Sequence, residues 1–339
     1  MDIKVMLMKK EKKKSKKAIK VVGIILAVIL VFTAGFTIVS HAVWHRSDMA
    51  TIVELYFRIS GTKNKFANAD ECQSYIEQRK TAGEYQLDPS TVKSDVTETT
   101  VDGNRVYTLA ASDTPECMVL YLHGGAYIND ASVYHWRICD KLAQKANADV
   151  VFPIYPLTPN HTWDETFDMV TKVYRDMLDT ADVPVIIMGD SAGGGLSVAF
   201  CEYLSEIGLQ QPDKMILFSP WMDISMSNPD AADYESADPM LSAYGLIEMG
   251  KCWAGDLDLK DYKVSPIFGD ISNLRNVYLF VGTREIFYPD VTKFYSMLNE
   301  QGVNSEIYIG EGMNHVYPLY PIPEANEAFK QICDILQKQ

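Results

Sequence analysis

The strongest constraint on this chain is a short stretch near its middle, where an apolar run leads directly into a serine flanked by glycines. Residues 185–188 are four apolar residues, and residues 189–193 read Gly-Asp-Ser-Ala-Gly, a match to G-x-S-x-G. Residues 196–200 are compatible with a helix. Glycines lack a Cβ atom, so a strand and a helix can approach closely around a serine on a tight turn. The stretch therefore predicts strand, sharp turn and helix, with Ser191 as a nucleophile.

Strand-like and helix-like segments alternate on both sides of this stretch. A hairpin is predicted around Asp102 and Gly103. Buried strands are predicted at 118–122, 150–155, 185–188, 215–218, 277–281 and 306–309, and helices at 136–146, 167–178 and 325–336. Repeated strand–helix units with continuous apolar strands predict an α/β fold, with a mostly parallel sheet covered by helices on both faces. Residues 222–265 break this rhythm, which predicts an insertion that caps an active site.

A second strong feature is the uncharged, apolar run at residues 21–39. About 19 helical residues span a hydrocarbon core of about 30 Å. Lysines crowd the N-terminal side only, which predicts a cytoplasmic N-terminus and an outward-facing body anchored in the cell membrane. The competing interpretation is a signal peptide cleaved near residues 40–42, which would release a secreted protein. The run is longer than an ordinary signal-peptide core, and this favours an uncleaved anchor.

Length and charge suggest one large domain behind this segment. The predicted organisation is a basic tail at 1–20, the membrane anchor at 21–40, a linker with cap helices at 41–94 and a catalytic domain at 95–339. Residues 1–20 contain nine lysines and two acidic residues, a local charge of +7. The whole chain has a net charge of −14, so the remaining residues carry about −21. An acidic body argues against nucleic acid as a partner. The six cysteines form no metal-binding or disulfide-scaffold pattern, so no metal or other cofactor is expected.

A loop rich in small residues follows the strand predicted at 118–122. It reads His123, Gly124, Gly125, Ala126. Small side chains leave backbone N–H groups open to a carbonyl oxygen, as an oxyanion hole requires. The candidate donors are the N–H groups of this loop and that of the residue after the nucleophile, namely Gly124, Gly125, Ala126 and Ala192. The alternative is a tight loop whose glycines serve geometry alone.

A serine nucleophile needs a histidine base and a carboxylate that orients it. His315 is the histidine that lies after the last predicted strand, as expected when the triad runs serine, acid, histidine. Glu285 is the first carboxylate beyond the strand at 277–281 and is the predicted acid. Asp290 is the second choice, because it is expected to cap a helix that begins at residue 291.

Four stretches resemble the hormone-sensitive-lipase group of α/β-hydrolase esterases. They are residues 123–127, 189–194, 219–223 and 312–315, and the resemblance extends over about residues 95–339. It implies a carboxylic-ester hydrolase with Ser191, Glu285 and His315 as its triad. It also implies that the N-terminal helices and residues 222–265 form a cap over an acyl pocket.

Two positions depart from the pattern of this group. Ala126 stands where the third glycine of HGGG is expected, but it keeps the N–H group that the oxyanion hole needs. Glu285 stands where the group usually carries an aspartate. The sequence thus predicts a membrane-anchored serine esterase acting on a small acyl ester. An acyltransferase or deacetylase acting on a cell-surface glycan or lipid, and a catalytically silent binding protein on the same scaffold, are the alternatives.

Overall fold

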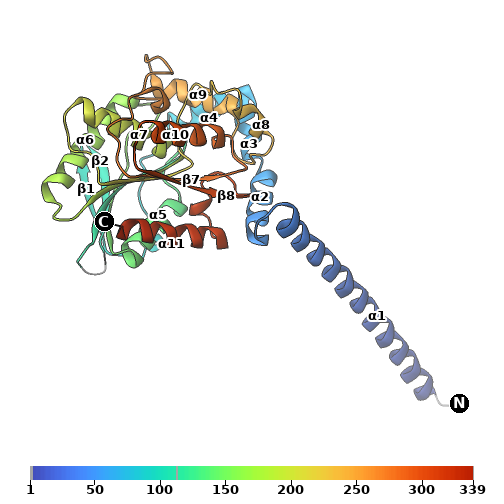
Figure 1. Ribbon diagram of the computed structural model, residues 1–339. Helices are drawn as coiled ribbons and strands as arrows, with labels where there is room; N and C mark the ends of the chain where they lie inside the picture. Colours follow the sequence, from blue (N-terminus) through green and yellow to red (C-terminus); the bar gives the residue numbers. More distant parts are fainter. Residues whose placement is uncertain (1–2, 112–113, 339) are drawn as a thin grey trace.

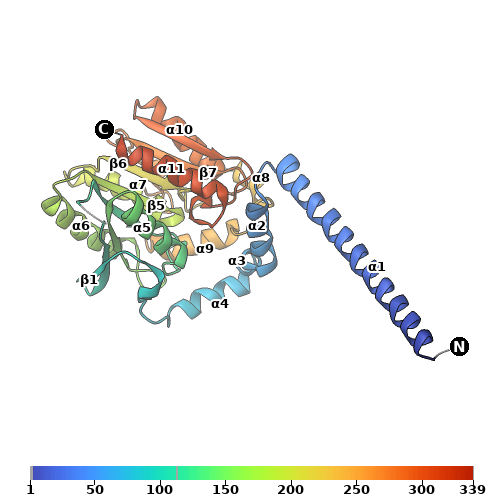
Figure 2. The same cartoon turned by 90° about the horizontal axis from the view of Figure 1, so that it is seen from below.

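A long N-terminal helix projects from the body of the molecule in this computed structural model, which describes residues 3–111 and 114–338. Helix α1 (Ile3–Ile38) continues into the short π-helix η1 (Val39–Val43), and Figures 1 and 2 show it standing clear of the sheet. Within it, Lys20–Val43 is apolar and long enough either to span a membrane or to be a signal sequence. Most side chains of the predicted basic tail, residues 1–20, lie outside the described part of the chain.

The body is built on one sheet, which has eight strands in the described residues, in the order β1-β2-β4-β3-β5-β6-β7-β8. Strand β2 runs antiparallel to both of its neighbours, and the pairs from β4 to β8 are parallel. The strands are β1 (Val96–Val101), β2 (Asn104–Leu109), β3 (Cys117–Leu122), β4 (Ala148–Pro153), β5 (Val185–Asp190), β6 (Lys214–Phe218), β7 (Val277–Gly282) and β8 (Ser305–Gly310). The predicted mostly parallel α/β sheet is confirmed.

Helices cover both faces of this sheet. Figure 1 shows α5 (Val133–Lys145) and α11 (Pro323–Gln337) on one face, and α6 (Trp163–Thr180), α7 (Ser191–Glu206) and α10 (Tyr288–Glu300) on the other. Their apolar side chains form two separate buried clusters, one on each face. Both faces of the central strands are therefore buried. This explains why the sequences of those strands are continuous apolar runs and do not alternate between apolar and polar residues.

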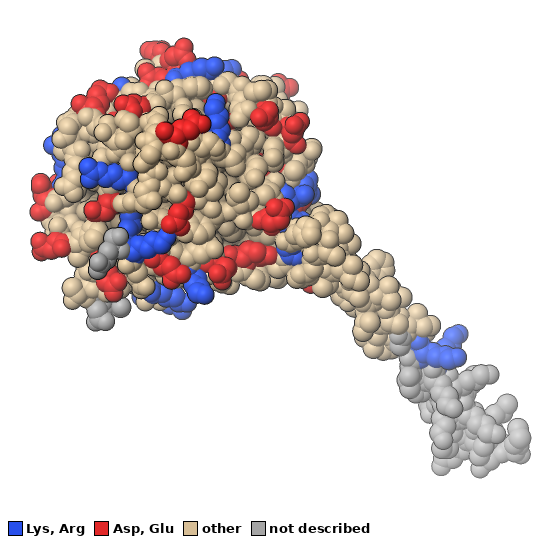
Figure 3. Space-filling view, viewed as in Figure 1, with Lys and Arg blue, Asp and Glu red and all other residues tan. Residues whose placement is uncertain are grey.

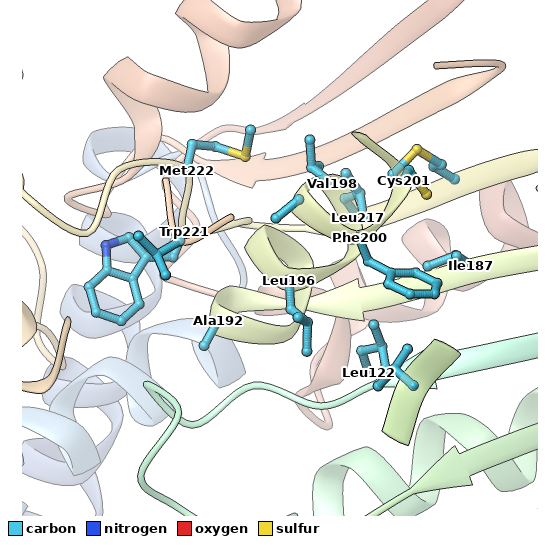
Figure 4. Close-up of a cluster of buried hydrophobic side chains, with 14 of the residues drawn as sticks. Leu122, Ile187, Ala192, Leu196, Val198, Phe200, Cys201, Leu217, Trp221 and Met222 are labelled. Atoms are coloured by element: carbon cyan, nitrogen blue, oxygen red, sulfur yellow. The ribbon is translucent and has the colours of Figure 1, made fainter. Parts of the chain in front are cut away.

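Helix α7 lies directly against the sheet. Leu196 and Phe200 on the helix pack with Leu122 and Ile187 on the strands (Figure 4). A Cβ atom at Gly193 would collide with the carbonyl oxygen of Leu122, so only glycine permits this close approach. The glycines that define the sequence motif thus set the distance between helix and sheet.

Two groups of helices lie side by side at one end of the molecule (Figure 2). The N-terminal group is α2 (Asp48–Ser60), α3 (Thr62–Ala67) and α4 (Ala69–Arg79), and residues 222–265 supply α8 (Ala231–Glu235) and α9 (Ala243–Ala254). Helices α3 and α4 both contact α9. Short 3-10 turns complete the described elements: η2 (Pro89–Thr91), η3 (Pro266–Phe268) and η4 (Tyr317–Leu319). We refer to the two groups of helices together as the cap helices.

Candidate active site

Ser191 lies at the junction of β5 and α7. Its backbone has φ 52°, a left-handed conformation that costs a non-glycine residue free energy and is typical of a functional turn. The side chain is 8% exposed, and its Oγ lies 2.9 Å from His315 Nε2. Because Ser191 begins α7, its hydroxyl stands at the positive end of a helix dipole.

His315 lies in the loop between β8 and α11 and contacts two partners. Its Nδ1 lies 2.6 Å from Glu285 Oε2. An ionised carboxylate can only accept, so Nδ1 carries the proton and Nε2 is left to accept from the hydroxyl of Ser191. Burial alone lowers the pKa of His315, but the adjacent Glu285 carboxylate outweighs it and the pKa is raised above the ordinary 6.5.

Glu285 is fully buried in the turn between β7 and α10. Its Oε1 accepts from the backbone N–H of Gly282 at 2.6 Å and from Ser219 Oγ at 2.7 Å. Ser219 Oγ in turn accepts from the backbone N–H of Val316 at 3.0 Å. The three predicted residues Ser191, His315 and Glu285 are therefore in contact as a chain. No pattern in the sequence predicts this role for Ser219, although Ser219 opens one of the four stretches that resemble the family.

Asp290 does not reach this chain of contacts. Helix α10 begins at Tyr288 with Pro289 in its first turn, so Asp290 lies inside the helix and the predicted role as its cap is wrong. Its Oδ1 accepts instead from Asn228 Nδ2 at 2.7 Å, and burial raises the pKa of its carboxyl group. Glu285 is thus the carboxylate that the structure places on His315.

The predicted oxyanion loop is present, but one of its N–H groups is occupied. The backbone N–H of Gly124 donates to Asp190 Oδ1 at 3.1 Å, so Gly124 is not a free donor and the prediction for it is wrong. Gly125 and Ala126 have positive φ values of 131° and 54° and line the same cavity as Ser191. Ala192 lies in the first turn of α7, where backbone N–H groups have no acceptor within the helix. Gly125, Ala126 and Ala192 remain the candidate donors.

Asp190 forms a second buried polar group beside the nucleophile. Its Oδ1 also accepts from Tyr121 OH at 3.0 Å, and its Oδ2 lies 3.2 Å from His135 Nε2. The backbone N–H of Ser132 donates to His135 Nδ1 at 2.8 Å, so the proton of this imidazole is on Nε2 and points at Asp190. Burial opposes ionisation of Asp190, but the histidine and these donors lower its pKa. The charged Asp190 therefore holds the oxyanion loop against the nucleophile turn.

Ser191 and His315 open into a cavity of about 290 Å³. Its walls are mostly apolar and come from α2, α3, α9 and the loops before α9 and α11: Phe57, Phe66, Met240, Leu246, Met249 and Leu319. Asp190 is the only carboxylate among its described lining residues. No three metal-ligating side chains lie together in residues 3–111 and 114–338. The cavity is thus shaped for an uncharged, apolar group next to a serine hydroxyl.

Comparison with known proteins gives the same architecture. The alpha/beta hydrolase fold family matches residues 119–319. An esterase of Acinetobacter venetianus is 28% identical over 222 residues, covering 64% of this chain and 73% of that protein. A solved structure of a protein from Staphylococcus aureus, proposed there to be an esterase, is 33% identical with a TM-score of 0.77 and covers 80% of this chain and 94% of that one. A hormone-sensitive lipase from a metagenome library is 26% identical with a TM-score of 0.72, over 85% and 97% of the two chains. The chain therefore belongs to the alpha/beta hydrolase fold family, within its hormone-sensitive-lipase group of esterases.

Proposed function

We propose that this protein is a membrane-anchored serine carboxylesterase that cleaves short acyl esters. The observation that carries the proposal is the unbroken contact from Ser191 Oγ to His315 Nε2 at 2.9 Å and from His315 Nδ1 to Glu285 at 2.6 Å. A hydroxyl, an imidazole in the correct tautomer and a buried carboxylate are the groups that acyl transfer needs.

The reaction proceeds in two steps. Ser191 Oγ attacks the ester carbonyl while His315 Nε2 takes the hydroxyl proton, and the N–H groups of Gly125, Ala126 and Ala192 stabilise the negative oxygen. His315 then gives this proton to the leaving alkoxide, which departs as the alcohol and leaves an acyl-enzyme. A water molecule gives a proton to His315, attacks the acyl carbon and releases the acid, and the proton returns to Ser191.

The size of the cavity supports short acyl chains. A volume of about 290 Å³ is at the small end of ligand sites. Bulky residues of the cap helices, Phe57, Phe66 and Met249, form its walls. Hydrolysis is therefore expected to fall as the acyl chain lengthens beyond what this space accepts.

The N-terminal helix supports the anchor. Figure 3 shows no Lys, Arg, Asp or Glu on the visible surface of α1 between the lysines toward its free end and the body. Lys17 and Lys20 precede the apolar stretch that ends at Val43. Because lysines crowd that side of the segment, we expect the N-terminus to be cytoplasmic and the catalytic domain to lie on the opposite side of the membrane.

The test is hydrolysis of p-nitrophenyl esters, from acetate to long acyl chains, by the full chain in detergent. Ser191→Ala is expected to lower kcat at least about 10⁴-fold, because the nucleophile is lost. Ser205→Ala is the matched control, since Ser205 lies on the same helix α7 and its Oγ accepts from Gln211 at 2.9 Å, away from the cavity. Retained turnover in folded Ser191→Ala would refute the assignment.

A further inference from the structure

Helix α2 presents an apolar face to solvent. Met49, Ile52, Leu55, Tyr56 and Ile59 are between 44% and 76% exposed. They recur at spacings of three and four residues, so they form one continuous stripe along the helix. We call this stripe the α2 apolar face. Glu54 is buried on the other side of the helix, and the two other charged side chains of α2 have partners: Asp48, at the start of the stripe, accepts from Thr37, and Arg58 donates to Glu54 and to the carbonyl of Ala237.

The opposite side of α2 fixes the helix to the body. Glu54 is paired with Arg46, and its Oε1 also accepts from Arg284 Nη2 at 3.0 Å. At the start of the helix, the backbone N–H and the Oγ of Ser47 donate to the carboxylate of Glu324 on α11, at 2.6 and 2.9 Å. The direction in which the α2 apolar face points is therefore set by the catalytic domain.

The α2 apolar face is continuous with the proposed membrane segment. That segment ends at Val43, and α2 begins five residues later, at Asp48. Two hydrogen bonds close the junction: Thr37 Oγ1 donates to Asp48 Oδ2 at 2.7 Å, and the backbone N–H of Arg46 donates to the carbonyl of Ser40 at 3.0 Å. The first turn of α2 thus stays beside the end of the membrane segment (Figures 1 and 2).

We infer that the α2 apolar face lies on the outer surface of the lipid bilayer, with its side chains among the acyl chains near the headgroups. An amphipathic helix with an apolar stripe lies in the membrane plane in this way. Trp44 and Tyr56 are residue types that belong at such an interface. This inference rests on the proposed anchor, since the end of that anchor holds α2 at the membrane surface.

This position brings the cavity to the membrane. Phe57 lies on the inner side of α2 and lines the cavity that contains Ser191. One helix therefore contacts lipid on one side and substrate on the other. The substrate class that follows is an uncharged ester dissolved in the bilayer, which reaches the cavity past α2.

The direct test uses fluorescence of the full chain in phosphatidylcholine vesicles, with and without bromine on the acyl chains near the headgroups. Ile59→Trp introduces a reporter on the α2 apolar face. Phe268→Trp is the matched control, because Phe268 is 41% exposed in η3 and is followed by Gly269, which packs against Glu202 toward the far end of α7. The fluorescence added by Ile59→Trp is expected to fall at least twofold in brominated vesicles, and that added by Phe268→Trp is expected to stay unchanged.

The same vesicles separate failure of this inference from failure of the anchor. The fluorescence of Trp44 is the difference between the wild-type chain and Trp44→Phe, and its quenching in brominated vesicles reports the anchor. Neither fluorescence measurement depends on catalysis. Quenching of Trp44 without quenching at position 59 would overturn the bilayer contact and leave the anchor standing. If bromine does not quench the Trp at position 59 and the protein has the mass of a dimer, a second copy covers the α2 apolar face and the inference is wrong.

Turnover tests the substrate class. For each variant, the rate on an ester dissolved in vesicles is divided by the rate on a water-soluble ester. Ile52→Asp combined with Ile59→Asp is expected to lower this ratio about tenfold, because charge on the α2 apolar face is costly in lipid. Phe268→Asp should leave the ratio at the wild-type value. An unchanged ratio in the double variant would refute delivery from the bilayer.

Discussion

Ser219 donates its hydroxyl proton to Glu285, with 2.7 Å between Oγ and Oε1. The same oxygen accepts from the backbone N–H of Val316, which follows His315 directly. One buried hydroxyl at the end of β6 thus joins the loop of the acid to the loop of the base. The backbone of Ser219 has φ 46°, a left-handed conformation that a non-glycine residue adopts only where the surrounding structure imposes it.

Removing this hydroxyl should slow catalysis without abolishing it. In Ser219→Ala, Glu285 loses one of its donors and the N–H of Val316 loses its acceptor, at a cost of about 1–3 kcal/mol in total. We expect kcat for p-nitrophenyl acetate to fall about tenfold with KM nearly unchanged, since the cavity walls are untouched. A change confined to KM would contradict this positioning role.

The pH profile should report His315. The imidazole must be neutral to take the proton of Ser191, and its pKa is raised above 6.5 by Glu285. The value of kcat/KM is therefore expected to rise with pH, with a midpoint above 6.5. In Glu285→Gln the raising charge is gone and burial remains, so the midpoint should move to lower pH while kcat falls about 10³–10⁴-fold. An unmoved midpoint would show that another group titrates.

The choice between the two candidate acids can be tested with a pair of variants. Asp290→Asn should keep kcat within about threefold of the wild-type value, because Asp290 contacts Asn228 and not His315. Glu285→Ala should lower kcat at least about 10³-fold. The reverse ranking, measured on protein whose circular dichroism matches the wild type, would move the role to Asp290.

Glu54 should stabilise the fold in a pH-dependent way. Burial disfavours its charge, but hydrogen bonds from Arg284, Arg46 and Arg58 lower its pKa to about 2. The stabilisation is present above the ordinary pKa of about 4.5 and is lost as the pH falls from there toward 2. Glu54→Gln should reduce the free energy of unfolding by about 3 kcal/mol at pH 7. The difference in Tm between the two proteins should narrow at pH 4; a constant difference would exclude a charge effect.

Asp238 links residues 222–265 to the loop of the triad acid. Its carboxylate accepts from the backbone N–H groups of Met240, Leu241 and Ile286, at 2.7, 2.9 and 3.0 Å. In Asp238→Asn, the NH₂ group of the new amide faces at least one of these backbone N–H groups, so that a hydrogen bond is lost. We expect kcat to fall about tenfold, and the midpoint of the pH profile to move down, because a charge that raises the pKa of His315 is lost. A lower Tm without either kinetic change would mean that Asp238 is purely structural.

Much of the fold and the core of the site could be predicted from the sequence, because each lies in a local pattern. Apolar runs mark buried strands, and Ser191, Glu285 and His315 each follow a predicted strand in the expected order. The residues of the proposed triad can therefore be identified without knowledge of long-range contacts.

The remaining partners depend on contacts between distant parts of the chain. Ser219 is 66 residues from Glu285, and Glu54 is 230 residues from Arg284, so no local pattern pairs them. The direction of the N–H of Gly124 is set by a turn, and sequence does not determine that it points at Asp190. Asp290 resembles a helix cap and so predicts a helix start at residue 291, whereas Pro289, in the first turn, marks the observed start of α10 at Tyr288.

The contacts of Arg46 limit where the proposed anchor can be cut without damage to the catalytic domain. Arg46 is buried, pairs with Glu54 and donates to the carbonyl of Gly312 at 3.2 Å, in the loop that carries His315. Proteolysis on the N-terminal side of Arg46 would shed a domain with all of these contacts intact. Proteolysis after residue 60 would remove α2, and with it Glu54 and the Phe57 wall of the cavity. With the proposed anchor, a cut within the few residues between the end of the membrane segment and Arg46 is therefore the one that releases the domain with the contacts of Arg46 and the Phe57 wall intact.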